Sequence, residues 1–173
     1  SLRNLTKELE AQEGHLPSLL LRGELHYLYR EHAESLKDLN NVLNTNPYEA
    51  KAYFFKGLNF KELGDFEKAI SQFQTTVEQD PYHIEAYEQL AFVYAYLANP
   101  LAELYFDNAL AVDSSNVQMW YNKGMYLQGL KRYTDAEKCY QAMLRRDKFN
   151  QFANYNLGYL NYEKEEYELA ANY

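Results

Sequence analysis

Apolar residues recur along this chain at intervals of three and four, the spacing of helices with one buried face. The pattern repeats about every 34 residues, a period typical of helical-hairpin arrays. Turn-forming residues separate the repeats, so we predict an all-α fold of about ten or eleven helices. The predicted parts are an N-terminal helix packed on the first repeat (1–15), four repeats (16–49, 50–83, 84–116 and 117–150) and a partial repeat (151–173).

Two positions of the repeat predict how its helices meet. The eighth position carries small residues, namely Gly23, Gly57, Ala91, Gly124 and Gly158. The twenty-fourth carries mostly large apolar ones, namely Leu39, Phe73, Phe106, Tyr140 and Tyr173. Glycine inside a helix costs about 0.5–1 kcal/mol relative to alanine, so this column indicates close helix contact. We expect Gly57 and Gly124 to tolerate alanine but not leucine, because overpacking costs about 1–3 kcal/mol.

The second repeat carries the fullest motif, with Tyr53–Phe60 followed by Gly64–Ala69 and Pro81. Pro47 and Pro81 mark repeat ends, because proline cannot continue a helix. These residues resemble the tetratricopeptide repeat (TPR) family, and the resemblance extends over residues 16–173. It implies antiparallel helix pairs stacked in a right-handed superhelix, whose concave face holds a partner polypeptide.

Some residues depart from the family pattern. The seventh position is usually leucine in the family, but here it holds Arg22, Lys56 and Lys123. We expect their stems to lie on apolar surface while the charges reach water. His26 occupies a position that is normally an aromatic core site, which favours a packed histidine over a ligand.

The family resemblance also predicts the residues that line the concave face. Reading its first-helix positions gives an aromatic, mostly uncharged stripe that consists of Phe54, Leu58, Phe92, Tyr96, Tyr121, Met125, Tyr155, Tyr159 and Tyr162. Exposed aromatic surface of this extent is typical of partner sites. A minority of these side chains is expected to pack between neighbouring first helices instead.

The sixth position carries an amide in the last three repeats, at Gln89, Asn122 and Asn156. The segments around Asn122 and Asn156 look like the asparagine-bearing repeats of the O-linked N-acetylglucosamine transferase superhelix. That resemblance implies a ladder that grips the backbone of an extended peptide. An amide suits this role because it both donates and accepts hydrogen bonds. The alternative is that these are ordinary solvated helix residues.

Composition narrows the function classes. The formal net charge of -8 opposes nucleic-acid binding, which needs a basic face, and is compatible with a neutral or basic protein partner. The one cysteine, Cys139, cannot form an intrachain disulfide. The longest strongly apolar stretch, Leu90–Ala98, is too short to cross a bilayer, so no direct membrane insertion is expected. The sequence carries no phosphate loop, metal-spaced Cys or His pair, or serine elbow. We therefore predict a non-enzymatic protein-interaction module without a cofactor.

Several alternatives stay open. A carboxylate-clamping chaperone adaptor is disfavoured, because Leu20, Glu24, Glu85 and Gln89 replace the basic and amide residues that such a clamp uses. Two further alternatives are a substrate-docking segment of a larger enzyme and an assembly subunit such as a bacterial envelope lipoprotein. The sequence ends inside the second helix of the partial repeat, so end-to-end self-association is a further expectation. The compartment is undetermined: cytoplasmic, or periplasmic if a leader was removed.

Overall fold

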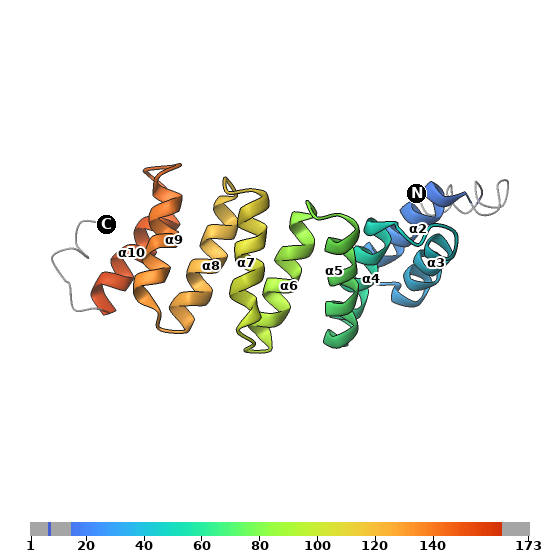
Figure 1. The fold of residues 1–173 in the computed structure, drawn as a ribbon, viewed down its shortest axis with the longest axis horizontal. Helices are drawn as coiled ribbons and strands as arrows, with labels where there is room; N and C mark the ends of the chain where they lie inside the picture. The colour runs from blue at the N-terminus through green and yellow to red at the C-terminus, as the bar shows by residue number, and fades with distance from the viewer. Residues whose placement is uncertain (1–6, 8–14, 164–173) are drawn as a thin grey trace. The chain divides into compact units, whose positions relative to one another are not determined.

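The computed structural model describes Lys7 and residues 15–163, and every regular element in this part of the chain is an α-helix (Figure 1). The nine helices described are α2 (Leu16–Leu28), α3 (His32–Thr45), α4 (Ala50–Glu62), α5 (Phe66–Gln79), α6 (Ile84–Tyr96), α7 (Leu101–Val112), α8 (Val117–Gly129), α9 (Tyr133–Leu144) and α10 (Gln151–Glu163). The predicted all-α fold is confirmed. Helices α2, α4, α6, α8 and α10 begin where the sequence places the repeat starts. The predicted helix in 1–15 and the end of the partial repeat, with Ala170 and Tyr173, lie outside the described residues.

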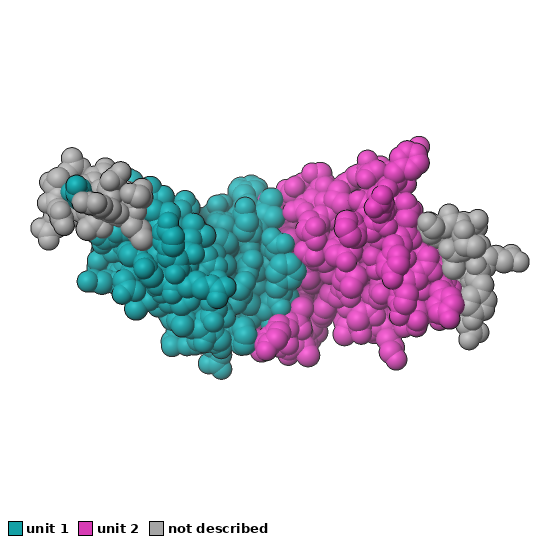
Figure 2. Space-filling model, turned by 180° about the vertical axis from the view of Figure 1, so that it is seen from behind, with its two compact units in different colours: residues 1–93 teal, residues 94–173 magenta. Residues whose placement is uncertain are grey.

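The chain divides into two compact units, residues 1–93 and 94–173, which Figure 2 colours separately. In the first unit α2 packs on α3, α3 on α4, and α4 on α5. In the second unit α7 packs on α8, α8 on α9, and α9 on α10. Each unit therefore consists of consecutive helices that pack on their neighbours along the chain, as the repeat pattern predicts.

The small residues at the eighth position do allow close helix contact. A Cβ added to Gly57 would lie 2.5 Å from Cε1 of Phe73, and one added to Gly124 would lie 2.6 Å from Cε1 of Tyr140. Both rings are fully buried, so neither has free space to move into. The structure therefore contradicts the expectation that alanine is tolerated here, because even one methyl group overlaps the ring.

The turn inside each of the first four repeats depends on one residue with left-handed backbone. These residues share the fifteenth repeat position: Arg30 (φ 61°), Gly64 (φ 78°), Ala98 (φ 52°) and Lys131 (φ 59°). Left-handed geometry at the helix end lets the next backbone N–H reach back to a carbonyl; Asp65 N donates to Phe60 O at 2.9 Å. Only Gly64 adopts this geometry without a Cβ penalty.

A partly buried ion pair joins α2 to α3 in the first unit. Nε and Nη2 of Arg22 donate to the two carboxylate oxygens of Asp38, each at 2.6 Å. Asp38 is only 2% exposed. The Asp38 carboxylate raises the pKa of the Arg22 guanidinium above its usual value. The Arg22 side chain keeps about 20% of its surface exposed, so its charge still reaches water in part, while the twenty-third repeat position supplies a buried counter-charge.

Hydrogen bonds extend this polar contact from α3 to α4. The Ser35 hydroxyl donates to the backbone carbonyl of Gly23 at 2.8 Å, and Asn59 Nδ2 donates to Ser35 Oγ at 2.9 Å. Asn59 and Ser35 are fully buried. His26 is half-buried, as predicted. Its ring also makes a polar contact, because Nδ1 lies 2.5 Å from a carboxylate oxygen of Glu31. The first unit is thus held in part by polar contacts.

Candidate partner-binding surfaces

The residues of the predicted concave stripe differ widely in exposure. Tyr96, Tyr155 and Tyr162 are largely exposed, and Phe92, Met125 and Tyr159 are moderately exposed. Phe54, Tyr121, Gln89 and Asn122 are half-buried. Leu58 and Asn156 are 8% and 6% exposed. These last two lie within the helical packing and do not line an open surface in this structure, which corrects the sequence interpretation.

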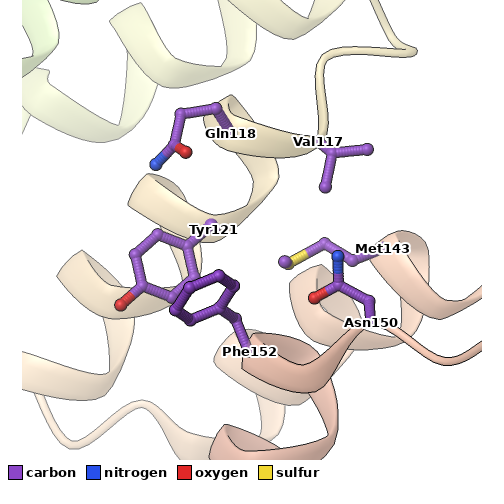
Figure 3. Close-up of a pocket in the computed structure, with 6 residues that line it drawn as sticks. All are labelled: Val117, Gln118, Tyr121, Met143, Asn150 and Phe152. Atoms are coloured by element: carbon purple, nitrogen blue, oxygen red, sulfur yellow. The ribbon is translucent and has the colours of Figure 1, made fainter. Parts of the chain in front are cut away.

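The second unit contains a cavity of about 390 Å³ at the start of α8 and α10. We refer to it as the apolar cavity; it is lined by Val117, Gln118, Tyr121, Met143, Asn150 and Phe152 (Figure 3). Figure 3 shows the rings of Tyr121 and Phe152 next to each other on one side. Their centroids are 5.8 Å apart and their planes meet at 62°, an edge-to-face contact. The cavity is therefore walled by two rings.

The remaining lining residues give the apolar cavity a hydrophobic base and polar edges. Met143 is buried on α9 and directs its thioether toward the cavity (Figure 3). Gln118 Nε2 donates to Asn122 Oδ1 at 3.0 Å, and Asn150 Oδ1 accepts from the backbone N–H of Ala153 at 3.0 Å. None of the described residues that line this cavity is charged. Such a site suits an apolar group flanked by hydrogen-bonding atoms.

The predicted amide ladder is largely engaged within the chain. Asn156 Nδ2 donates to the carbonyl of Phe152 on its own helix at 2.7 Å. Asn122 Oδ1 accepts from Gln118, and Gln89 Oε1 accepts from the Lys61 ammonium. Asn156 is therefore not presented to a partner in this structure. Backbone recognition by Asn122 and Gln89 stays a prediction.

The first unit contains a second pocket, of about 430 Å³, where α4 and α6 begin. We refer to it as the acidic pocket; it is lined by Glu49, Ala50, Lys51, Phe54, Phe55, Asp80, His83 and Glu85. Phe54 contacts two other lining rings, with its ring centroid 5.7 Å from that of Phe55 and 4.6 Å from that of His83. Aromatic surface surrounded by carboxylates thus distinguishes this pocket from the uncharged cavity of the second unit.

Sequence reasoning missed several of these lining residues. Lys51, Glu85, Gln118 and Phe152 all occupy the second position of their repeats. That position belongs to the concave face in the TPR family, so the signal was present and was not used. Asn150 and Asp80 come from the loops between repeats, where helical spacing gives no information about which surface a side chain faces.

The titratable side chains in the described part of the chain form neither a metal site nor a reactive thiol. No group of three or more His, Cys, Asp or Glu side chains there is arranged to hold a metal ion. Burial raises the pKa of the Cys139 thiol to about 11, which opposes formation of a reactive thiolate. None of the helices described has both the length and the apolar character needed to cross a bilayer.

Comparison with protein-family models identifies tetratricopeptide repeats over much of the chain. One model described as a tetratricopeptide repeat matches residues 99–150 and 121–173. A second with the same description matches residues 50–83, the second predicted repeat.

Three curated proteins illustrate the similarity. Human tetratricopeptide repeat protein 6 is 26% identical over 140 residues, which cover 81% of this chain and 27% of that protein. Anaphase-promoting complex subunit 3 of Schizosaccharomyces pombe is 25% identical over 74% of this chain and 19% of its own length. Type IV pilus assembly protein PilF of Pseudomonas aeruginosa is 35% identical over 94 residues, 54% of this chain and 36% of PilF. The chain therefore spans between about a fifth and a third of these relatives.

Solved structures share the fold. The C-terminal part of a TPR repeat-containing protein from Cytophaga hutchinsonii matches with a TM-score of 0.85 at 18% identity, over 95% of this chain and 66% of that one. YrrB, described as a TPR protein with an unusual peptide-binding site, matches with a TM-score of 0.78 at 20% identity, over 98% of this chain and 88% of YrrB. At these identities the likeness concerns the fold alone. Together with the repeat models, it shows that the chain belongs to the tetratricopeptide repeat family.

Proposed function

We propose that this chain is a non-catalytic module that binds a segment of another protein in the apolar cavity. Its repeats and its relatives support a protein–protein interaction scaffold. The observation that carries the finer proposal is the cavity itself, with two ring walls, a methionine base and no charge among its described lining residues. Its volume of about 390 Å³ falls within the range of roughly 300–1,000 Å³ that is usual for ligand sites.

An apolar side chain of the partner is the group that fits this cavity best. It would contact the exposed faces of Phe152 and Tyr121, while the Gln118 amide at the edge would bond to the partner's backbone. Full burial of a large apolar side chain stabilises by about 1.5–3 kcal/mol. The exposed rings of Tyr155 and Tyr159 on α10 add contact surface beyond the cavity.

The test is a pair of phenylalanine variants on peptides selected by the chain from a random display library. Phe152 lines the apolar cavity and is 67% exposed, whereas Phe149 is 86% exposed and does not line it. We expect Phe152→Ala to raise the dissociation constant about tenfold or more. Phe149→Ala should change it less than about twofold, because surface substitutions away from a site have small effects.

Fluorescence polarisation measures both constants, and circular dichroism checks that both variants fold. Failure to select any peptide would contradict the proposal. Equal weakening by Phe152→Ala and Phe149→Ala would also contradict it, since that result would place the binding surface elsewhere.

A second candidate function has one specific observation in its favour. The name of PilF describes it as an assembly protein, and this chain is 35% identical to it over 94 residues. The chain would then be an assembly or docking segment of a larger envelope complex or enzyme, which includes the case of a bacterial lipoprotein. Chemical crosslinking of the full-length protein in its own cells would distinguish the two. A stoichiometric complex that survives purification favours assembly, and weak exchange of peptide segments favours the peptide-binding module.

A further inference from the structure

The acidic pocket of the first unit has an aromatic floor that a ligand can reach. Phe54 and Phe55 are both half-buried, so part of each ring faces open space. Phe54 also contacts the buried ring of Phe73, with centroids 5.8 Å apart, and its position is therefore fixed by the hairpin core. Rigid ring faces of this kind favour an apolar stem or a planar cation.

Three carboxylates border this floor, and each comes from a different segment. Glu49 precedes α4, Asp80 follows α5, and Glu85 lies in the first turn of α6. Two of them accept hydrogen bonds from neutral donors. Glu49 accepts from the Asn46 amide at 3.3 Å, and Asp80 accepts from the backbone N–H of Tyr82 at 3.1 Å.

Within the described residues, no lysine or arginine neutralises these carboxylates. In the part of the chain that the structure describes, none of the three forms an ion pair with a lysine or arginine. Lys51, which also lines the pocket, is already paired, with Nζ 2.6 Å from a carboxylate oxygen of Glu24. Glu85 lies 3.3 Å from the His83 ring, a charged contact only when that histidine is protonated.

The charge of Glu85 also contributes to the pKa of a neighbouring residue. The pKa of Glu88 on α6 is raised, first by burial and then by repulsion from Glu85, while Lys61 lowers it. A positive group bound in the pocket would relieve this repulsion. A metal ion is disfavoured as that group, because the described carboxylates do not converge as ligands.

We propose that the acidic pocket binds a lysine or arginine side chain of the partner segment. The stem lies over the ring of Phe54, and the charged head lies among the carboxylates of Glu49, Asp80 and Glu85. Arginine fits better than lysine, because its planar guanidinium both stacks on a ring and bonds to a carboxylate with two N–H groups. This inference rests on the proposed function, since it assumes that the ligand is a protein segment.

The test compares two double variants that remove the same net charge. Asp80→Asn with Glu85→Gln removes two of the three carboxylate charges of the pocket while preserving side-chain shape. Glu67→Gln with Glu78→Gln is the control, because both glutamates are exposed on α5 and do not line the pocket. The probes are peptides selected by the parent chain from a random display library. Each is remade with citrulline in place of arginine, or acetyl-lysine in place of lysine, which removes the charge and keeps the stem.

We expect the loss of charge at one basic residue of each peptide to weaken binding to the parent chain about three- to tenfold. The same peptide change should weaken binding to the pocket variant less than about twofold. It should weaken binding to the control variant as much as binding to the parent chain. An equal effect in all three proteins would overturn the inference, because it would show long-range attraction to the acidic chain. Peptides that bind without any sensitive basic residue would overturn it as well.

The outcome also separates this inference from the proposal on which it rests. Peptides that depend on Phe152 but are indifferent to the pocket variant would overturn only the inference about a basic side chain. Failure to select any peptide would overturn both.

Discussion

The substitution Gly57→Ala tests the packing that joins the two helices of the second repeat. The added Cβ would lie 2.5 Å from Cε1 and 2.6 Å from Cδ1 of Phe73. Ordinary contact between such atoms is about 3.5–4.0 Å. The Phe73 ring is fully buried and contacts the ring of Phe54, so it cannot turn aside without disturbing a second aromatic side chain.

Two opposing effects set the magnitude for Gly57→Ala. Alanine favours the helix by about 0.5–1 kcal/mol relative to glycine. Overpacking of a filled core costs about 1–3 kcal/mol. The overlap is severe and the ring is enclosed, so we expect a net loss of about 1–2 kcal/mol in the free energy of unfolding. A glycine-to-alanine change inside a helix would then destabilise the protein, against its intrinsic helix propensity.

Urea denaturation followed by circular dichroism measures this change, with Gly129→Ala as the matched control. Gly129 ends α8, and an added Cβ there would meet no atom within 4 Å apart from its chain neighbours and its own helix backbone, so that variant should be neutral or slightly more stable. Combining Gly57→Ala with Phe73→Leu should cost less than the sum of the single changes, because the smaller side chain removes the overlap. If Gly57→Ala were as stable as the parent chain, the close contact would be refuted.

Three further predictions concern stability and reactivity. Asp38→Asn should lower the free energy of unfolding by about 1–3 kcal/mol in urea denaturation, because it leaves the Arg22 guanidinium without its buried counter-charge. Lys131→Gly should raise the free energy of unfolding by up to about 1 kcal/mol, since glycine adopts positive φ freely; Gly64→Ala should lower it by a similar amount. The folded-state pKa of Cys139, about 11, exceeds the ordinary thiol value of 9.0, so its contribution to stability is complete below that value and is lost as pH rises from about 9 to 11. Mass spectrometry should accordingly show slower iodoacetamide labelling of Cys139 at pH 8 in the folded chain than in urea, and equal rates would contradict its burial.

Much of the fold could be predicted from the sequence, because the residues that specify each helical hairpin lie close together in the chain and recur in every repeat. The glycine and aromatic columns pair Gly57 with Phe73 and Gly124 with Tyr140, and the structure has both contacts. The glycine at this position did not reveal how little room an added Cβ would have, because that room depends on the distance between the two helix backbones. The helices likewise begin at the predicted repeat starts, where the turn chemistry recurs.

The candidate surfaces were less accessible to sequence reasoning. Helical spacing places Leu58 and Asn156 on the first helices of their repeats, but it does not say which side chains a neighbouring helix covers. The Asn156 amide donates a hydrogen bond to a carbonyl of its own helix. An asparagine side chain can bond either to its own backbone or to a partner, and the residue type alone does not say which. The acidic pocket combines carboxylates from two loops and one helix, and only the folded chain brings Glu49 and Asp80 together.

The partly buried pair of Arg22 and Asp38 shows a similar limit. The two residues lie 16 positions apart, and their opposite charges are visible in the sequence. The burial of Asp38 is not visible, because charged side chains usually reach water. The pairing depends on the hairpin, which places the seventh and twenty-third repeat positions side by side.

The most direct test of partner binding in the apolar cavity is a titration of the chain, labelled with ¹³C at its methionine methyl groups, with a selected peptide. The chain has three methionines. Met143 forms the base of the cavity, while Met119 is fully buried and does not line it. We predict that the Met143 methyl signal shifts on binding and shows nuclear Overhauser contacts to an apolar side chain of the peptide, while the Met119 signal stays in place. A peptide that binds without changing the Met143 signal would contradict the assignment of the cavity as the binding site.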